Sequence, residues 1–422
     1  MKVFKFGGAS LKDAASIKNV ATVLQHYQKQ KLTIVVSAMG KTTNALENLC
    51  DAYYFQKGDV NQILNEIKDF HFNIIHQLFA DKQHLIYNEV SNLFVELDWI
   101  TEENPVHSYD QEYDQIVSLG EIVSSKILSL YLNEVGIKNN WMDVRDVLQT
   151  DNNYREGKVD WEITQTNALE NLLPLFTSKD IVITQGFIGG TSENYTTTLG
   201  REGSDYTAAI LAYCTNAEEV IIWKDVPGVL NADPKWFNDT VLIPQLSYQD
   251  AIELAYYGAT VIHPKTIKPL QNKNISLYVK SFVSPEEKGT LINNEQAGLP
   301  TPCFIFKVNQ VLISIAPKDF SFIAEESLSN IFGLLASLNV KINLMQHSAI
   351  SFSVCTDFNE QQTPKVIELL QKEFRVLYNK DVELATVRYY DKATIDRVST
   401  NKEVLLEQRS RYTIQLVMRN QK

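Results

Sequence analysis

Short apolar runs rich in β-branched residues alternate with helical patterns through the first 292 residues, and this alternation is the feature that most limits the possible folds. Such an order favours an α/β domain with a mainly parallel sheet sandwiched by helices. In that architecture ligands gather at the carboxyl ends of the strands. The strands are expected at residues 3–6, 33–37, 141–144, 181–186, 219–223 and 275–281.

Between about residues 59 and 136 the pattern is mostly helical and rich in polar residues. We interpret this stretch as a cap inserted over the site, which holds the acceptor substrate. Further along, the segment 293–302 is polar and contains Gly298, Pro300 and Pro302, a composition typical of a linker.

The chain after the linker predicts a second fold. A strand (311–316), a helix (328–338), two strands (340–345 and 350–355), a helix (364–374) and a short strand near Val376 follow one another. This βαββαβ order is ferredoxin-like. A strand at 382–390 and a hairpin of 404–407 with 413–418 begin a second such unit, which we expect to be cut short because no helix follows Arg419.

Two glycine-rich loops predict a site for phosphoryl transfer. The first, Lys5-Phe6-Gly7-Gly8-Ala9-Ser10, lies between the first strand and an amphipathic helix, and the second is Gly200-Arg201-Glu202-Gly203-Ser204-Asp205. Glycines let backbone N–H groups approach an anion closely, and a helix N-terminus adds unsatisfied donors. Lys5 adds a full positive charge.

Three side chains near these loops have both a functional and a structural interpretation. Asp205 either orients the Lys5 ammonium or is the N-cap or a first-turn acid of the helix that follows it. Glu121, in Ser118-Leu119-Gly120-Glu121, either receives a substrate ammonium or relieves the dipole of its helix. Arg201 offers a planar fork that matches a carboxylate.

The run Ser37-Ala38-Met39-Gly40-Lys41-Thr42-Thr43-Asn44 resembles half of a P-loop, but Val35 stands where that motif needs its first glycine. A Walker-type NTPase is therefore rejected. We interpret the loop as one that presents hydroxyl and N–H groups to a ligand, and a plain turn remains the alternative.

The segment 223–235 is a strand end, a Pro-Gly turn and a polar loop, and it predicts a nucleotide pocket. The backbone of Val229 and Leu230 would edge an adenine, while Asp225 and Asp233 would reach ribose or metal-bound water. The alternative is a rigid surface turn.

Two later motifs have simpler interpretations. Ser247-Tyr248-Gln249-Asp250 predicts a capping-box start to a helix. His263, which precedes a proline, is expected to be structural, and Lys265 is a candidate to face phosphate.

Composition excludes several classes of function. The net charge is −12, from 39 basic and 51 acidic residues, which argues against binding to nucleic acid or an anionic membrane. The four cysteines show no C-x-x-C pair, so neither a zinc site nor a disulfide framework is expected. Without an apolar leader or a long apolar run, we expect a cytoplasmic protein.

Taken together, the motifs resemble those of aspartate kinase, in the amino acid kinase family. The motifs are KFGGAS, SAMGKTTN, SLGE, GREGSDYTAA, DVPGVLNADPK, ELAYYGATVIHPKT and GTLI, in the family's order. The C-terminal units resemble the paired ACT domains of the same enzymes. The resemblance implies a catalytic domain at 1–292, a linker at 293–302, a first ACT domain at 303–381 and a shortened second one at 382–422.

The resemblance also implies transfer of the γ-phosphoryl group of MgATP to the β-carboxylate of L-aspartate, the first step toward lysine, threonine and methionine. Lys5 and Asp205 would be catalytic, and Thr43, Glu121, Arg201 and Ser204 would bind substrate. The nucleotide would contact Gly7, Gly8, Ser10, Lys224, Asp225, Leu230, Asp233, Lys235 and Lys265. No metal ligands are expected from the protein, because the ATP phosphates would hold Mg²⁺.

The sequence departs from the family pattern at Ala9, Lys224, Leu230 and Thr260. At Thr260 the family has a lysine that meets ATP phosphate, and we hypothesise that Lys224 or Lys265 supplies this charge. The resemblance further implies a homodimer formed through the ACT domains, with lysine or threonine as a feedback effector near Asn343, or alternatively a simple strand there. Competing functions are a catalytically weak amino-acid sensor and a related kinase with another carboxylate acceptor.

Overall fold

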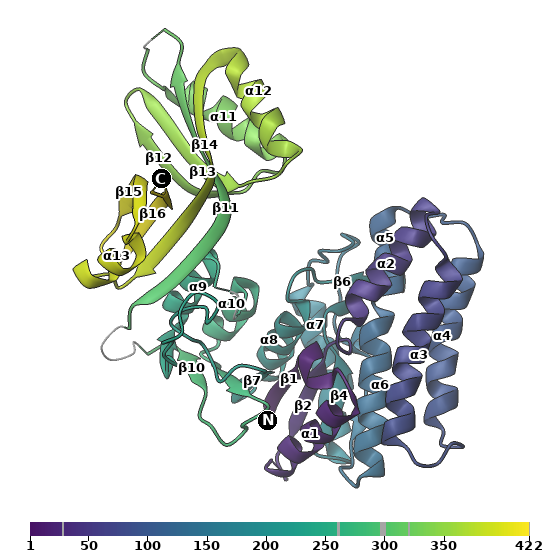
Figure 1. The fold of residues 1–422 in the computed structure, drawn as a ribbon. Coiled ribbons are helices and arrows are strands. Elements are labelled where there is room, and N and C mark those ends of the chain that lie inside the picture. The colour runs from purple at the N-terminus through teal and green to yellow at the C-terminus, as the bar shows by residue number, and fades with distance from the viewer. Residues whose placement is uncertain (28, 260–261, 296–300, 320, 422) are drawn as a thin grey trace. The chain divides into compact units, whose positions relative to one another are not determined.

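The computed structural model describes residues 1–27, 29–259, 262–295, 301–319 and 321–421. The chain divides into two compact units (Figure 1). The first comprises residues 1–229, 242–252 and 261–297, and the second comprises 230–241, 253–260 and 298–422. The second unit therefore takes two short segments from within the predicted catalytic domain.

The first unit is built on an eight-stranded sheet in the order β3-β4-β2-β1-β7-β9-β10-β8. All neighbouring strands are parallel except β9 and β10. The strands are β1 (Lys2–Phe6), β2 (Leu32–Val36), β3 (Asn140–Trp141), β4 (Ile181–Gln185), β7 (Glu219–Lys224), β8 (Gln245–Ser247), β9 (Ser276–Ser281) and β10 (Thr290–Asn293). A mainly parallel α/β sheet is thus confirmed, as are all the predicted strands except 141–144.

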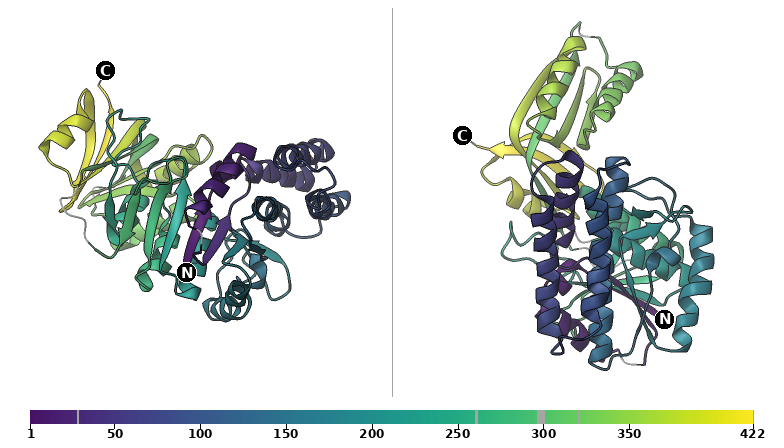
Figure 2. Two further views of the ribbon diagram at one scale, coloured as in Figure 1. Left: turned by 90° about the horizontal axis from the view of Figure 1, so that it is seen from below. Right: turned by 90° about the vertical axis from the view of Figure 1, so that its right-hand side faces the viewer.

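The helices of this unit cover both faces of the sheet. They are α1 (Ala14–Gln25), α2 (Thr42–Phe55), α3 (Val60–Leu78), α4 (Ile86–Glu102), α5 (Tyr109–Val117), α6 (Leu119–Glu134), α7 (Trp161–Asn167), α8 (Gly203–Thr215) and α10 (Pro264–Asn272). Helix α9 (Tyr248–Tyr257) is divided between the two units, because its residues from 253 onward belong to the second. A two-stranded sheet joins β5 (Ile188–Gly190) to β6 (Thr196–Thr198). The predicted helical stretch 59–136 forms α3 to α6, and α3, α4 and α6 run side by side (Figures 1 and 2).

Alternation along β1 decides which helix each side chain meets. Phe4 and Phe6 belong to the fully buried core that also includes residues of α1 and α6. Because successive side chains of a strand point to opposite faces, Lys5 points to the other face, where α8 lies against β1. The alternation along β1 thus places two phenylalanines in the core of the unit and the Lys5 ammonium on the opposite face.

Two local predictions need correction. Val144 begins a 3₁₀ turn, η2 (Val144–Asp146), so the strand predicted at 141–144 ends early. The first glycine loop leads into another 3₁₀ turn, η1 (Gly8–Leu11), rather than into the helix itself. Helix α1 begins at Ala14, because the Asp13 carboxylate accepts a 2.7 Å bond from the Ser16 N–H and so caps it there.

The second unit contains a six-stranded antiparallel sheet in the order β12-β13-β11-β14-β16-β15. Its elements are β11 (Cys303–Pro317), α11 (Glu325–Ser337), β12 (Ile342–Ser348), β13 (Ser351–Asp357), α12 (Gln362–Glu373), β14 (Phe374–Arg388), α13 (Lys392–Ser399), β15 (Lys402–Arg409) and β16 (Thr413–Asn420). The order β14-β11-β13-β12 is that of a ferredoxin-like unit, which confirms the predicted βαββαβ fold.

The strands predicted near Val376 and at 382–390 are one continuous strand, β14. Its second half pairs on one side with β16 and on the other with residues 303–307, the first part of β11. The second ferredoxin-like half of this sheet therefore has four strands. Its fourth strand is residues 303–307, which come before the elements of the first ferredoxin-like half in the sequence. Its helix α13, between β14 and β15, was not predicted. The structure therefore has more strands here than the expected shortened unit, and no helix follows β16 among the described residues.

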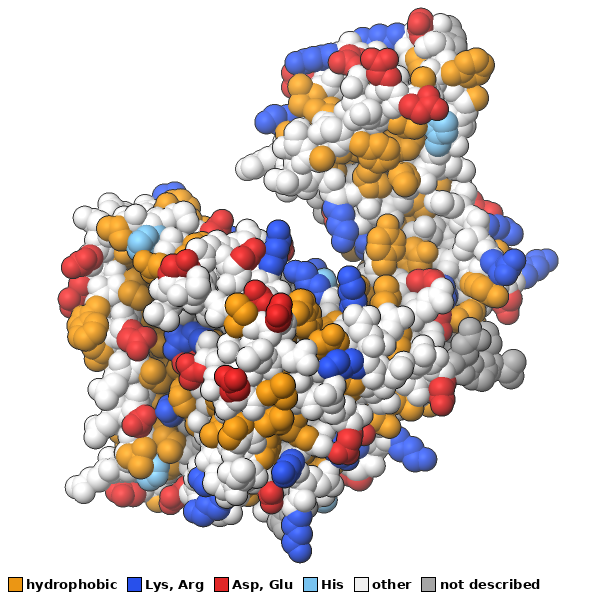
Figure 3. Space-filling model, turned by 180° about the vertical axis from the view of Figure 1, so that it is seen from behind, with side chains coloured by type: hydrophobic (Ala, Val, Ile, Leu, Met, Phe, Trp, Pro, Cys, Tyr) orange, Lys and Arg blue, Asp and Glu red, His pale blue; other side chains and the backbone are white. Residues whose placement is uncertain are grey.

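On the side shown in Figure 3, basic and acidic side chains are interspersed and form no continuous basic field. Within the described part of the chain, no helix is both long and apolar enough to cross a membrane. All four cysteines are buried, and none of them forms a disulfide.

Candidate functional site

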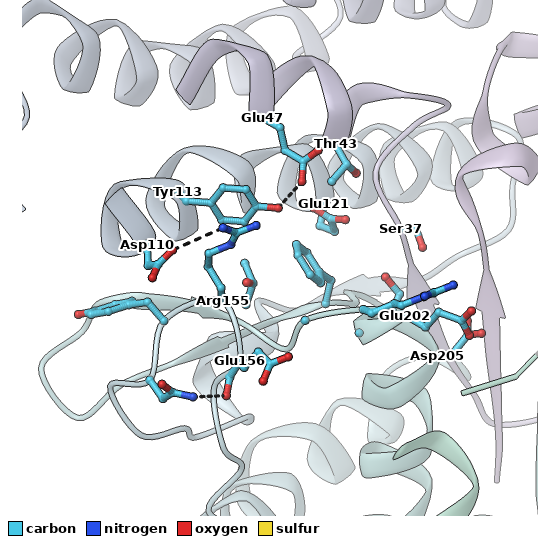
Figure 4. Close-up of a pocket in the computed structure, with 18 of the residues that line it drawn as sticks. Ser37, Thr43, Glu47, Asp110, Tyr113, Glu121, Arg155, Glu156, Glu202 and Asp205 are labelled. Carbon is cyan, nitrogen blue, oxygen red and sulfur yellow. Dashed lines mark hydrogen bonds and ion pairs between the residues drawn. The ribbon is translucent and has the colours of Figure 1, made fainter. Parts of the chain in front are cut away.

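A cavity of about 830 Å³ opens at the carboxyl ends of four adjacent strands of the first unit (Figure 4). Lys5 of β1, Ser37 after β2, Phe187 after β4 and Lys224 of β7 all line it. The register explains their meeting, because Phe6 is level with Val36 of β2 and with Trp223 of β7. Parallel strands in this register bring distant parts of the sequence to one edge.

A buried ion cluster occupies one wall of this cavity. The Lys5 Nζ lies 2.6 Å from Asp205 Oδ1, and the Lys224 Nζ lies 3.6 Å from Asp205 Oδ2. Burial alone would raise the pKa of Asp205, but the two ammonium groups outweigh it and hold that pKa below its usual value. Asp205 is the third residue of α8, so it is an acid of the first turn and not the N-cap, which is Glu202.

Glu121 forms a buried acidic point of the cavity. Its side chain is 3% exposed, Oε1 accepts a 3.2 Å bond from the Ala38 N–H, and Oε2 has no hydrogen-bond partner. Burial raises the pKa of Glu121 to about 8, although the Ala38 bond and the charge of Lys5 lower it somewhat. A buried carboxyl with an unpartnered oxygen is suited to receive a donor from a ligand.

The other predicted substrate residues also reach the cavity. Thr43, Arg201 and Ser204 line it, Arg201 being exposed and Ser204 buried. The loop before α8 turns sharply, with Glu202 in the left-handed region at φ 54°. Packing there is close, because a Cβ on Gly186 would lie 2.5 Å from the Ser204 Cβ.

Apart from Lys5, the first glycine loop packs beside the cavity and contributes no lining residue. A Cβ on Gly8 would meet the carbonyl oxygens of Ala38 and Gly40 at 2.9 Å, which only glycine avoids. A Cβ on Gly7 would lie 3.4 Å from the Lys5 Nζ. Ser10 is buried and its hydroxyl has no hydrogen-bond partner. A buried hydroxyl left in this state is a candidate ligand contact.

The predicted nucleotide residues are not all brought together. Lys224 lines the cavity, and Asp225 next to it is exposed and does not. Leu230, Asp233 and Lys235 belong to the second unit and are not among the lining residues. Thr260, which departs from the family pattern, lies outside the described residues.

Lys265 lines a different cavity of about 620 Å³, beside Tyr206 and Tyr213 of α8. Lys224 and Lys265 were the two candidates to replace the lysine that the family has at position 260. Of these two, Lys224 borders Asp205 and Lys265 lines the other cavity. The expected structural roles nearby are confirmed. The His263 Nδ1 accepts a 3.2 Å bond from the Lys265 N–H as the N-cap of α10, and the Ser247 hydroxyl accepts one from the Asp250 N–H at 3.0 Å.

Asn343 lies in strand β12, as the strand alternative predicted. Its side chain is buried and already bonded within the second unit. The amide nitrogen donates to Gln310 at 2.8 Å and to Asp357 at 3.0 Å, and the amide oxygen accepts from Lys307 at 2.8 Å. A ligand bound to this amide would have to replace one of these partners.

Sequence reasoning missed one side of the cavity. Glu47, Asp110, Tyr113, Arg155 and Glu156 line it, and Figure 4 shows Arg155 pointing toward Tyr113 and Asp110. They come from α2, α5 and the loop before α7. The polar run Asn152-Asn153-Tyr154-Arg155-Glu156 between two apolar segments was the available signal, but nothing local shows that it turns toward the strand ends.

In charge terms the cavity combines cations with carboxylates. Four cations line it, Lys5, Lys224, Arg155 and Arg201, together with six carboxylates, those of Glu47, Asp110, Glu121, Glu156, Glu202 and Asp205. Fixed cations stabilise phosphate and carboxylate groups, and a buried carboxylate attracts an ammonium group. The arrangement can therefore hold a polyanion next to an amino acid.

Comparison with known proteins gives concordant findings. The model of the amino acid kinase family matches residues 1–281. The chain is 31% identical over 356 residues to lysine-sensitive aspartokinase 3 of Escherichia coli, an alignment that covers 84% of this chain and 78% of that protein.

Solved structures agree. The fold is similar to that of E. coli aspartokinase III in complex with aspartate and ADP, with a TM-score of 0.82, 26% identity, and coverage of 99% of this chain and 96% of that one. It is equally similar to the same enzyme in complex with lysine and aspartate, with a TM-score of 0.84, 26% identity, and coverage of 99% and 95%.

Proposed function

Because the chain belongs to the amino acid kinase family, and within it to the aspartokinases, we propose that it transfers the γ-phosphoryl group of ATP to the β-carboxylate of L-aspartate. The products are β-aspartyl phosphate and ADP. One observation carries the proposal: the cavity at the strand ends joins the Lys5–Asp205–Lys224 cluster to the buried carboxyl of Glu121.

The reaction needs no general base. An oxygen of the β-carboxylate attacks the γ-phosphorus, the bond from that phosphorus to the β,γ-bridging oxygen breaks, and the electron pair leaves on ADP. Two anions must approach in line, so the main task is to offset their repulsion and the charge that develops. Lys5 lies at the centre of this task, and Asp205 holds its ammonium in place at 2.6 Å without removing its charge.

The acceptor is held at its other groups. We assign Glu121 to the α-ammonium group, because its Oε2 is buried without a partner. Arg201 is assigned to the α-carboxylate, and Thr43 and Ser204 complete the wall of the pocket. Ser10 and Gly8 would bring N–H and hydroxyl donors to the nucleotide phosphates from the first glycine loop.

Lys224 is assigned to the phosphate charge in place of a lysine at Thr260, because its Nζ borders Asp205 whereas Lys265 lines another cavity. Mg²⁺ would enter bound to the ATP phosphates and supply additional positive charge there. Among the described residues, no group of three or more His, Cys, Asp or Glu side chains is arranged to hold a metal.

The decisive experiment traps the acyl phosphate. The protein is incubated with MgATP, hydroxylamine and, in turn, aspartate, glutamate or N-acetylglutamate, and hydroxamate is measured. We expect hydroxamate with aspartate alone. Signal with another acceptor would identify a related kinase, and no signal with any acceptor would favour an amino-acid sensor.

We further propose that the C-terminal unit binds an amino-acid effector and pairs with a second copy to form a homodimer. The E. coli relative is named as lysine-sensitive and was crystallised with lysine. Titrating lysine and threonine into the trapping assay, with the wild-type chain and with Asn343→Ala, tests this directly. Inhibition by neither amino acid would contradict the regulatory part and leave the proposed reaction standing.

A further inference from the structure

Arg155 has a backbone conformation that its residue type does not favour. Its φ is 64°, in the left-handed region, where a residue with a side chain typically costs about 1 kcal/mol or more. Glycine would be the unstrained choice at this position. An arginine at a strained position on the wall of the cavity suggests that the side chain itself is needed there.

The strained backbone is fixed by a buried acid. The Arg155 N–H donates to Asp114 Oδ2 at 2.9 Å. Asp114 also accepts bonds from the Thr198 N–H at 2.9 Å and from the Thr198 hydroxyl at 2.7 Å, so it ties the loop of Arg155 to strand β6. A fully buried carboxylate committed to this loop is far more than a surface turn requires.

The side chain is also oriented. Its guanidinium lies 4.3 Å from the ring centre of Tyr113, and the Tyr113 hydroxyl donates to Glu47 at 2.5 Å, which fixes that ring. The one described side-chain bond of the guanidinium is a long contact of 3.5 Å with Asp110. Figure 4 shows the guanidinium beside Tyr113 and Asp110 on the wall of the cavity.

We propose that Arg155 is a specificity-determining residue that binds the α-carboxylate of the acceptor together with Arg201. This inference rests on the proposed function. Aspartate has two carboxylates, and the one that reacts must face Lys5. A second, pre-oriented guanidinium at the other side of the cavity selects acceptors with a free α-carboxylate and turns the β-carboxylate toward the phosphoryl group.

The alternative is a purely structural role, in which Arg155 only forms an exposed ion pair with Asp110. Such a pair contributes little, since both side chains are about half exposed, at 44% and 57%. It explains neither the strained backbone nor the commitment of Asp114. The two interpretations differ in what the loss of the side chain does to acceptor recognition.

The test uses Arg155→Gly, which removes the side chain while relieving the backbone strain. KM and kcat are measured by hydroxylamine trapping for aspartate, for its α-amide and for ATP. We expect the KM for aspartate to rise about 10- to 100-fold, the size of a lost charged hydrogen bond, with the KM for ATP unchanged. The preference for aspartate over its α-amide should fall by a similar factor, and Arg155→Lys should restore part of it.

Lys158→Ala is the matched control, because it removes one positive charge from the same loop but faces the neighbouring cavity. Its KM for aspartate should stay at the wild-type value. An unchanged aspartate KM in Arg155→Gly, or an equal rise in the ATP and aspartate KM values, overturns the inference. If the wild-type chain itself forms no acyl phosphate with aspartate, the proposed function fails instead.

Discussion

Asp205 and Glu121 are both buried in the first unit, yet their pKa values move in opposite directions. Two ammonium groups offset the cost of burying Asp205, so its pKa is lowered and it stays ionised. Glu121 has no cation in contact, so burial raises its pKa to about 8. Of these two buried groups in the free protein, Asp205 is therefore ionised, and Glu121 is ready to ionise when an ammonium group binds.

Glu121 gives a prediction with a definite sign. Below about pH 8 the free carboxyl is largely protonated, so binding the α-ammonium group of aspartate must release a proton. We expect the KM for aspartate to fall as the pH rises from 6.5 to 8.5 and to be high and flat in Glu121→Gln. Trapping assays across this range measure it, and a pH-independent KM in the wild-type chain would argue against the assignment.

The same shift predicts a stability effect. A carboxyl whose folded-state pKa lies above its unfolded value stabilises the fold at low pH and loses that contribution as the pH rises through the folded pKa. Ligand-free Glu121→Gln should therefore gain stability relative to the wild type between about pH 4.5 and 8. Urea unfolding at pH 5 and pH 8.5 would show the difference, and a constant difference between the two pH values would contradict it.

The two candidate phosphate lysines can be separated by single substitutions. Lys224→Ala should lower kcat about 100-fold, the typical cost of removing one fixed donor from developing charge, and should raise the KM for ATP. Lys265→Ala should change neither by more than about twofold, because its side chain lines another cavity. The reverse pattern would return the missing charge to Lys265.

At the scale of elements, the carboxyl ends of β1, β2, β4 and β7 define the site, and close packing keeps α8 against them. A Cβ on Gly186 would lie 2.5 Å from the Cβ and 2.7 Å from the Cα of Ser204. The strand end and the first turn of α8 can approach this closely only because residue 186 is glycine. This approach places Ser204 and Asp205 on the cavity wall.

Gly186→Ala should separate β4 from α8. We expect a loss of about 1–3 kcal/mol in unfolding free energy and a large fall in trapping activity, because Asp205 moves with its helix. Gly333→Ala is the matched control, since Gly333 lies exposed inside α11 with nothing within 4 Å of the new Cβ. It should be neutral or stabilising by about 0.5–1 kcal/mol. Equal effects of the two changes on activity would contradict this account.

At the scale of the whole molecule, the second unit is one sheet rather than two consecutive domains. Strands β11 and β14 each run through both ferredoxin-like halves, and residues 303–307 complete the half that lies last in the sequence. The buried residues Leu312 and Leu344 of the first half pack in one core with Leu384, Leu406 and Val417 of the other half. The halves of this unit therefore share backbone as well as core.

A chain that ends at residue 390 should consequently fail to give a soluble protein. It loses α13, β15 and β16, which leaves the long strand β14 with an open edge and an uncovered apolar face. Ending the chain at Asn420, the last residue of β16, should leave solubility unchanged. Gel filtration of the two truncated proteins measures this, and a monodisperse 1–390 chain would refute the prediction.

Much of the architecture follows from local pattern. The strand runs, the helical stretch before Gly136 and the βαββαβ order were predictable because periodicity and β-branching act within a few residues. The early end of the strand predicted at 141–144 and the start of α1 could not be predicted in this way. A 3₁₀ turn at the first place and the Asp13 cap at the second override the apolar pattern. Helix α13 was too short and too polar to stand out.

By itself, the sequence determined the chemistry that is available: Lys5, Glu121, Arg201 and Asp205 stand in motifs that point to phosphoryl transfer near an amino acid. Only the tertiary structure decided which side chains meet, because a strand's register and a loop's direction depend on partners far away in the sequence. That is why Lys224 and not Lys265 borders Asp205, why Arg155 lines the cavity, and why residues 303–307 pair with residues 384–388 of β14.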